Sequence, residues 1–236
     1  MKKKYLFNRF KKPGKKKNKN YNNLFHLLRY LSYWISIPFI YLPFTPNQIT
    51  FFANFLQVSS IIIIAYADGY FKFYGLLLYF IGGIFDFVDG NIARFKKKTS
   101  KKGIFYDQIG HVFVAPLFYI GIGVAAYNNN NDTFYLYITI LMAMFVPIMS
   151  YQIGVSPKYF NKKSKKTSAN QFITRSENKK TLFFIKKLVS GFYNYKIEFL
   201  FFAILFEILE TLAIISAFYF VLRFFLQLYV DQKNIS

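Results

Sequence analysis

The sequence predicts an all-α polytopic membrane protein, with six transmembrane helices preceded by an amphipathic interfacial helix. Of its 236 residues, 54% are hydrophobic and 22% aromatic, yet the chain carries a formal net charge of +21. High apolar content combined with strong basic charge is typical of membrane proteins with cationic cytoplasmic loops. Apolar runs of about 20 residues, long enough to cross a bilayer, recur along the chain. The basic residues collect between these runs, which supports the same fold class.

A basic nucleic-acid-binding protein is the alternative that lysine runs suggest. The lysines, however, lie in loops between long apolar runs, and the sequence has no helix-turn-helix, zinc-finger or RNA-binding pattern. We therefore expect no nucleic-acid partner. The chain has no cysteine, which excludes disulfides, thiol nucleophiles and cysteine-ligated metals.

The chain is expected to begin with two segments outside the bilayer core. Residues 1–20 form a basic tail rich in Lys and Asn, suited to anionic lipid headgroups. Residues 21–44 mix apolar and aromatic residues with a few polar ones, and Pro38 and Pro43 argue against one uninterrupted spanning helix. We expect an amphipathic helix along the membrane interface, with Trp34 at headgroup depth.

Residues 45–230 are expected to form the six-helix membrane domain, followed by a short tail at residues 231–236. The first four spans are predicted at residues 48–67, 71–94, 103–127 and 133–152. The apolar run at 197–230 would extend about 50 Å as a single helix, which is too long for one span. We therefore expect a turn near Glu207, Glu210 and Thr211 to divide it, with the fifth span beginning near Leu188.

The distribution of basic residues predicts the orientation. Residues 1–30 carry 11 Lys and Arg, residues 94–102 carry six, and residues 154–196 carry another 11, which is 28 of the 31 in the chain. With six spans, all three segments, including a basic loop at 154–190, lie on one face, which the positive-inside rule makes cytoplasmic. We expect both termini in the cytoplasm and the protein in the inner or plasma membrane.

Four polar residues inside the second and third predicted spans are the candidate functional residues. Asp86 and Asp89 are three residues apart, and Asp107 and His111 are four apart, so each pair shares a helix face. Ionisable groups within a span are costly and are functional candidates by default. Three acids in one apolar pocket must take up protons or bind metal. Oxygen ligands in this number suit Mg²⁺ or Mn²⁺, and two such ions would suit phosphoryl transfer.

Three neighbouring residues fit a ligand beside these acids. Gly90 and Ala93 have little bulk, so a flat or phosphorylated ligand could approach the helix, and Arg94 could clamp a phosphate or a carboxylate. The same acids would also suit a proton or ion pathway, or buried acids paired with lysines for structure. A transporter would be expected to show internal repeats or broken helices at the midplane, and the sequence shows no repeat.

The fixed positions of this stretch follow the pattern D-x2-D-G-x2-A-R-x8-G-x3-D, formed by Asp86, Asp89, Gly90, Ala93, Arg94, Gly103 and Asp107. This pattern resembles the defining motif of the CDP-alcohol phosphotransferases, integral membrane enzymes of phospholipid synthesis. The segment "TPNQIT" (residues 45–50) is similar to the Pro-Asn-x-x-Thr segment that often opens the first span of that family. An amphipathic helix followed by six spans is also that family's architecture, so the resemblance covers about residues 21–230.

The resemblance implies a reaction in phospholipid synthesis or in related glycolipid or polymer synthesis. Such enzymes bind a CDP-linked alcohol beside two divalent metal ions, Mg²⁺ or Mn²⁺, and transfer its phospho-alcohol part to an acceptor hydroxyl, releasing CMP. The donor would be CDP-diacylglycerol or a soluble CDP-alcohol. The family tends to form homodimers, so we expect one here, in contact with membrane lipids.

Carried over by position, the resemblance also implies residue roles. The three aspartates of the motif would bind metal, and Gly90, Ala93 and Arg94 would line the site of the cytidine nucleotide. Asn47 or Thr50 would help to line that site, although Pro and Asn in this segment serve equally well as a helix start.

His111 departs from the family's pattern, which continues with x3-D. That last aspartate is usually assigned as the base that deprotonates the acceptor. Three interpretations remain open: His111 is the base, it is a metal ligand that favours softer ions such as Mn²⁺ or Zn²⁺, or the site has lost turnover and only binds a nucleotide. Imidazole is chemically well suited to general-base work near neutral pH, with Asp107 beside it in the catalytic site.

The sequence gives a less specific signal for the residues that would bind the acceptor substrate. In relatives whose acceptor is a phosphorylated polyol, basic residues near the loop between the fourth and fifth spans contact that phosphate. Arg175 is the candidate here, because a guanidinium can hold a phosphate with two hydrogen bonds. Contact with anionic lipid explains the other basic residues of this loop without any substrate.

Overall fold

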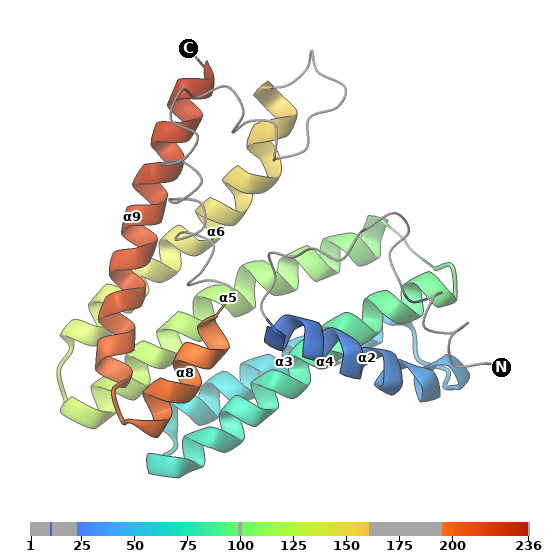
Figure 1. Cartoon of the computed structure of the whole chain (residues 1–236), viewed down its shortest axis with the longest axis horizontal. Helices are drawn as coiled ribbons and strands as arrows, with labels where there is room; N and C mark the ends of the chain where they lie inside the picture. Colours follow the sequence, from blue (N-terminus) through green and yellow to red (C-terminus); the bar gives the residue numbers. More distant parts are fainter. Residues whose placement is uncertain (1–9, 11–22, 99–100, 161–194, 236) are drawn as a thin grey trace. The chain divides into compact units, whose positions relative to one another are not determined.

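The computed structural model describes residue 10 and residues 23–98, 101–160 and 195–235, and the regular elements in these ranges are all helical. This confirms the all-α class. In chain order, the helices are α2 (Asn23–Tyr41), α3 (Pro46–Tyr66), the short 3₁₀ helix η1 (Gly69–Phe71), α4 (Lys72–Phe95), α5 (Lys101–Asn130), α6 (Phe134–Phe160), α8 (Lys196–Leu205) and α9 (Leu209–Ile235) (Figure 1). The chain divides into two compact units, residues 1–121 and 122–236, which are treated separately below.

Four helical stretches of the described chain are long and apolar enough to cross a membrane: Pro46–Tyr66, Gly69–Phe95, Phe105–Asn130 and Leu209–Leu226. A shorter apolar stretch covers Phe134–Pro147. These helices indicate a multi-pass membrane protein. Each of the first four predicted spans corresponds to one helix and overruns it by no more than one residue. The total of six stays a prediction, because the expected start of the fifth span at Leu188 lies outside the described residues.

Helix α3 begins with a capping box in the "TPNQIT" segment. The Thr45 hydroxyl accepts a hydrogen bond from the backbone N–H of Gln48 at 3.3 Å, and the Gln48 side chain accepts one from the backbone N–H of Thr45 at 2.8 Å. Pro46 occupies the first helical turn, where its missing N–H costs nothing. The expectation that this segment starts a helix is therefore confirmed.

Close contacts with glycines hold α4 and α5 against α3. A Cβ atom at Gly82 would lie 2.7 Å from Gln57 Cγ and 3.1 Å from the Ala53 carbonyl oxygen, and one at Gly110 on α5 would collide with the side chain of Asn54. Small residues of this kind let helix backbones approach closely in membranes, where dispersion contacts drive helix association. Helix α4 contacts both α3 and α2, so it lies at the centre of the described helices of this unit.

Helix α2 packs on α4 through an apolar core formed with α3. Its buried members are Leu28 on α2, Ile49 on α3, and Ile84, Val88 and Ile92 on α4. After α2 the chain is held at one further point, because the Lys96 ammonium donates to the carbonyl oxygens of Leu42 and Phe44, both at 3.1 Å.

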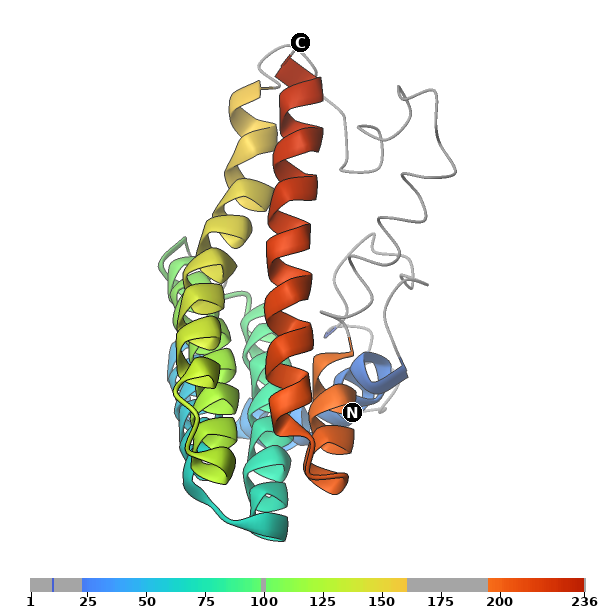
Figure 2. The same cartoon turned by 90° about the vertical axis from the view of Figure 1, so that its left-hand side faces the viewer.

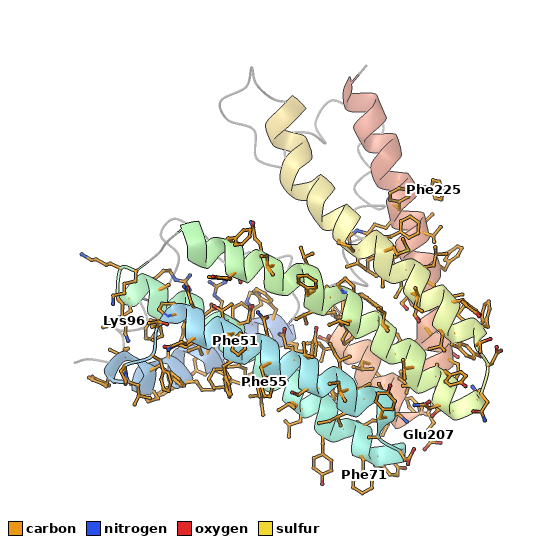
Figure 3. All side chains as sticks on the ribbon, turned by 180° about the vertical axis from the view of Figure 1, so that it is seen from behind. Phe51, Phe55, Phe71, Lys96, Glu207 and Phe225 are labelled. Atoms are coloured by element: carbon orange, nitrogen blue, oxygen red, sulfur yellow. The ribbon has the colours of Figure 1, made fainter. Side chains whose placement is uncertain are left out.

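Large apolar side chains project outward from the helices of this unit. Phe51 and Phe55 on α3 are 75% and 59% exposed, and Phe71 lies at the opposite end of α4 from Lys96 (Figure 3). Exposed aromatic rings along such apolar helices fit a lipid-facing surface.

In the second unit, α6 and α9 run side by side (Figure 2), and α8 packs against α9. The turn between α8 and α9 contains Glu207, whose φ of 55° places it in the left-handed region. The predicted division of the long apolar run near this residue is therefore confirmed. Glu210 lies in the first turn of α9, where its carboxylate accepts a hydrogen bond from the Asn129 side chain at 3.1 Å.

Candidate active site

Three carboxylates converge between α4 and α5, inside the first compact unit. Asp86 and Asp89 lie one helical turn apart on α4, and Asp107 lies near the start of α5. One carboxylate oxygen from each residue lies within 4.8 Å of the others. Asp89 is buried, and the other two are partly exposed. The structure thus brings together the three acids that the sequence singled out.

The donor set and its spacing fit a divalent cation. Carboxylate oxygens are the ligands that Mg²⁺ and Mn²⁺ prefer, and two opposite oxygens around Mg²⁺ lie about 4.2 Å apart. A separation within 4.8 Å therefore needs only a small closing movement to reach coordination distance. Burial makes such a group of like charges costly on its own, so a bound cation would relieve both the repulsion and the lost hydration.

Thr50 connects α3 to this cluster. Its hydroxyl donates to Asp89 Oδ2 at 2.5 Å, and the carbonyl oxygen of Pro46 lies 3.1 Å from the same hydroxyl. The hydroxyl has one proton for two acceptors, and the shorter contact is the one to the carboxylate. Thr50 is only 6% exposed, so water competes little with this bond. A hydrogen bond of this type orients a ligating carboxylate from behind.

The guanidinium of Arg94 lies over Gly90, which precedes it by one turn on α4. A Cβ atom at Gly90 would be 3.0 Å from Arg94 Nη1 and 3.3 Å from Nη2. Gly90 directly follows Asp89 in the sequence, and its missing side chain makes room for the guanidinium. Ala93 is partly buried on the same helix.

Two of the three guanidinium nitrogens of Arg94 already donate to the chain itself. Nη2 donates to Asn91 Oδ1 at 2.9 Å, and Nε donates to the Phe10 carbonyl oxygen at 2.7 Å. The Asn91 amide continues this network to Ser32 and Ser36 on α2. These three residues carry no charge, so they were not among the candidates predicted from ionisable groups. A signal was present, since two serines four residues apart mark a polar stripe on an otherwise apolar helix.

For three other predicted site residues, the structure describes no contact with the cluster. Asn47 lies in the first turn of α3 and is exposed. His111 belongs to α5, one turn after Asp107, but its side chain lies outside the described part of the structure. Arg175 falls within residues 161–194, which the structure does not describe. Their roles stay predictions.

Comparison with known proteins places this site in a family. The sequence profile of the family described as CDP-alcohol phosphatidyltransferase matches residues 44–229, a range that includes all three aspartates and Thr50. A search of curated proteins gives no match. Because the profile covers well over half of the chain, the protein belongs to the CDP-alcohol phosphatidyltransferase family.

Proposed function

We propose that this protein is a divalent-metal-dependent transferase that moves a phospho-alcohol group from a CDP-activated donor to an acceptor hydroxyl and releases CMP. The family transfers a phospho-alcohol from a CDP-alcohol to an acceptor, so the general reaction follows from membership. The observation that carries the metal dependence is the convergence of Asp86, Asp89 and Asp107 within 4.8 Å.

The three aspartates would hold two divalent cations, Mg²⁺ or Mn²⁺. Bound there, the ions would neutralise the diphosphate of the donor and stabilise the leaving CMP. Thr50 would keep the Asp89 carboxylate turned toward them, since its hydroxyl donates to Oδ2 from α3. We propose that the three aspartates and Thr50 form the polar, metal-binding side of the donor site.

The nucleotide would lie along the α4 face that carries Gly90, Ala93 and Arg94. The absence of a side chain at Gly90 leaves room for the Arg94 guanidinium on this face, and this cation would favour a phosphate group. Asn47, exposed in the first turn of α3, is the proposed contact from that helix.

The transfer forms one P–O bond and breaks another. The acceptor oxygen bonds to the donor's β-phosphorus, the bond from that phosphorus to the bridging oxygen breaks, and CMP leaves with the bridging oxygen. The acceptor's proton must go to a base, and we propose His111 for this role, beside Asp107, because a neutral imidazole accepts a proton near neutral pH. If His111 instead bound metal, it would favour Mn²⁺ or Zn²⁺ over Mg²⁺.

The surroundings of the site follow from the charges. We propose six spans with both termini and the site on the cytoplasmic face of the inner or plasma membrane, since 28 of the 31 basic residues would then lie on that face. Arg175 would bind the phosphate of a phosphorylated acceptor. The donor would be CDP-diacylglycerol or a soluble CDP-alcohol, and the working form would be a homodimer in contact with membrane lipids.

The test is CMP release by purified protein in detergent–lipid micelles. CDP-diacylglycerol and several soluble CDP-alcohols are each offered with mixed acceptors, with Mg²⁺, Mn²⁺ or a chelator present. We expect release that requires metal and is lost in Asp107→Asn. Asp68→Asn is the matched control, because Asp68 is an exposed acid outside the cluster whose side chain makes no capping hydrogen bond. Metal-dependent binding of cytidine nucleotides without CMP release from any donor would refute the transferase and favour a nucleotide-binding protein.

A further inference from the structure

A buried amide connects the N-terminal helix α2 to the motif residues of α4. Asn91 is 1% exposed, and its Nδ2 donates to Ser32 Oγ at 3.1 Å and to Ser36 Oγ at 3.0 Å. Its Oδ1 accepts from Arg94 Nη2 at 2.9 Å. Both serines are fully buried, so the network lies within the helix packing and not at its rim.

Hydrogen-bond accounting leaves one orientation for this amide. Arg94 has only donors, so it must face the amide oxygen. The hydroxyl of Ser32 donates to the Arg29 carbonyl at 2.8 Å, and that of Ser36 donates to the Ser32 carbonyl at 2.6 Å. Both serine oxygens are therefore available as acceptors for the two N–H groups of Asn91. The amide group of Asn91 and the hydroxyls of both serines are therefore satisfied, which is the condition for a rigid buried network.

The same guanidinium is held from a second direction. Arg94 Nε donates to the Phe10 carbonyl at 2.7 Å, and the Phe10 ring lies 6.0 Å from the rings of both Tyr33 on α2 and Phe95 on α4. Since Nη1 and Nη2 lie over Gly90, the guanidinium position is set jointly by α2, by residue 10 and by α4 itself.

We propose that Asn91 is a positioning residue: it locks α2 to α4 and so holds the Arg94 guanidinium over Gly90, at the side of the donor site. The role of Arg94 at the donor site rests on the proposed function. The connection of α2 to α4 through Asn91 does not. Packing alone does not call for an amide here, because an apolar side chain at 91 would bury the same surface without the cost of desolvating a polar group. The two hydrogen bonds to the serines instead fix the register of α2 against the motif.

This arrangement makes helix α2, which the sequence predicts at the membrane interface, part of the site. Any change that slides or lifts α2 must break the Asn91–serine bonds, and the amide that orients Arg94 then loses two of its three hydrogen-bond partners. Donor binding is therefore coupled to the docking of α2.

The single tryptophan of the chain provides a readout that needs no activity. Trp34 lies on α2 between the two serines and is 39% exposed. Its emission, and its quenching by brominated lipids of known depth, report the position of α2. Asn91→Leu removes all three hydrogen bonds at similar volume, and the double variant Ser32→Ala/Ser36→Ala removes only the α2 half. Ser60→Ala is the control, because Ser60 is equally buried but bonds only within its own helix.

We expect Asn91→Leu and the serine double variant each to shift Trp34 emission and its quenching profile. We also expect each to raise the KM for the CDP-linked donor by roughly tenfold or more, the size expected for a hydrogen bond to a charged group, with a smaller change in kcat. Combining the two changes should add little to either alone, because they break one network. Ser60→Ala should leave both readouts at wild-type values.

The proposal that Asn91 holds α2 against α4 would be refuted if Trp34 quenching were unshifted in both variants. It would also be refuted if the KM effects multiplied in the combined variant. If Asn91→Leu does not fold, Ser36→Ala alone carries the same Trp34 and KM test, since it removes one acceptor and little volume. A wild-type protein without transferase activity would refute the proposed function only, and the Trp34 measurement would still decide whether Asn91 holds α2.

Discussion

Replacing Thr50 by valine removes one hydroxyl and almost no volume, so it isolates the hydrogen bond between α3 and the carboxylate cluster. Thr50 and Asp89 are 6% and 8% exposed, so solvent cannot replace the lost donor. A hydrogen bond to a charged group is worth about 1.5–3 kcal/mol. At about 1.4 kcal/mol per factor of ten, this corresponds to a loss of roughly 10- to 100-fold in apparent metal affinity, the range typical of partners behind a metal ligand.

The assay titrates Mn²⁺ into wild-type and Thr50→Val protein and follows bound metal by electron paramagnetic resonance. CMP release is measured in parallel as a function of Mg²⁺. We expect half-saturation at roughly 10- to 100-fold higher metal concentration in both measurements, with the maximal rate recovered at saturating metal. The metal-free variant should also unfold at lower temperature, because Asp89 loses one of its hydrogen-bond donors while it stays buried.

Thr139→Val is the matched control for this experiment. Thr139 is 1% exposed and donates to the Tyr135 carbonyl at 2.7 Å, the same i−4 contact that Thr50 has with Pro46. Among the described residues, no carboxylate bonds to it. It should leave metal affinity unchanged. Equal metal affinity in wild type, Thr50→Val and Thr139→Val would refute the conclusion that the Thr50 hydroxyl orients Asp89 for metal.

Three further predictions concern the cluster, the base and the helix packing. Asp107→Asn should abolish metal binding at concentrations that saturate the wild type, and retained binding would remove this residue from the site. His111→Ala should lower kcat by at least about 100-fold with nucleotide and metal affinity retained, and His111→Asp should restore part of it, whereas weakened metal binding would make His111 a ligand. Gly82→Ala should destabilise the folded protein by about 1–3 kcal/mol, because the new Cβ overpacks against Gln57, and should therefore lower the melting temperature in detergent. Gly83→Ala should leave the melting temperature unchanged, because its Cβ would meet nothing closer than 3.9 Å.

The convergence of the acids could be predicted from spacing alone. Residues three apart on one helix share a face, and a short connection to the next helix lets Asp107 approach that face. The contact between Thr50 and Asp89 could not be predicted from spacing, because it depends on the rotation of α3 about its axis. That rotation is set by close contacts at Gly75, Gly82 and Gly110, which a single sequence does not pair with their partners.

The network around Asn91 was missed for a different reason. A neutral amide carries no charge, so an argument from the cost of ionisable groups passes over it, although an unsatisfied amide in the same place would also be costly. The pair Ser32 and Ser36 indicated a polar stripe on α2, yet nothing in the sequence says that this stripe faces α4 and not the headgroups. Only the packing of Leu28 against Val88 and Ile92 decides that orientation.

The segment before and at the start of α3 is part of the site and not a linker. Thr45 and Gln48 cap the helix, which places its first turn, and Lys96 from the end of α4 holds the carbonyls of Leu42 and Phe44 just before it. Thr50 then reaches Asp89 one turn into the helix. The lysine contacts and the Thr50–Asp89 bond join this segment to α4, so a shift of α3 along its axis would break both. Through this hydrogen bond the "TPNQIT" segment contacts an aspartate 39 positions away in the chain.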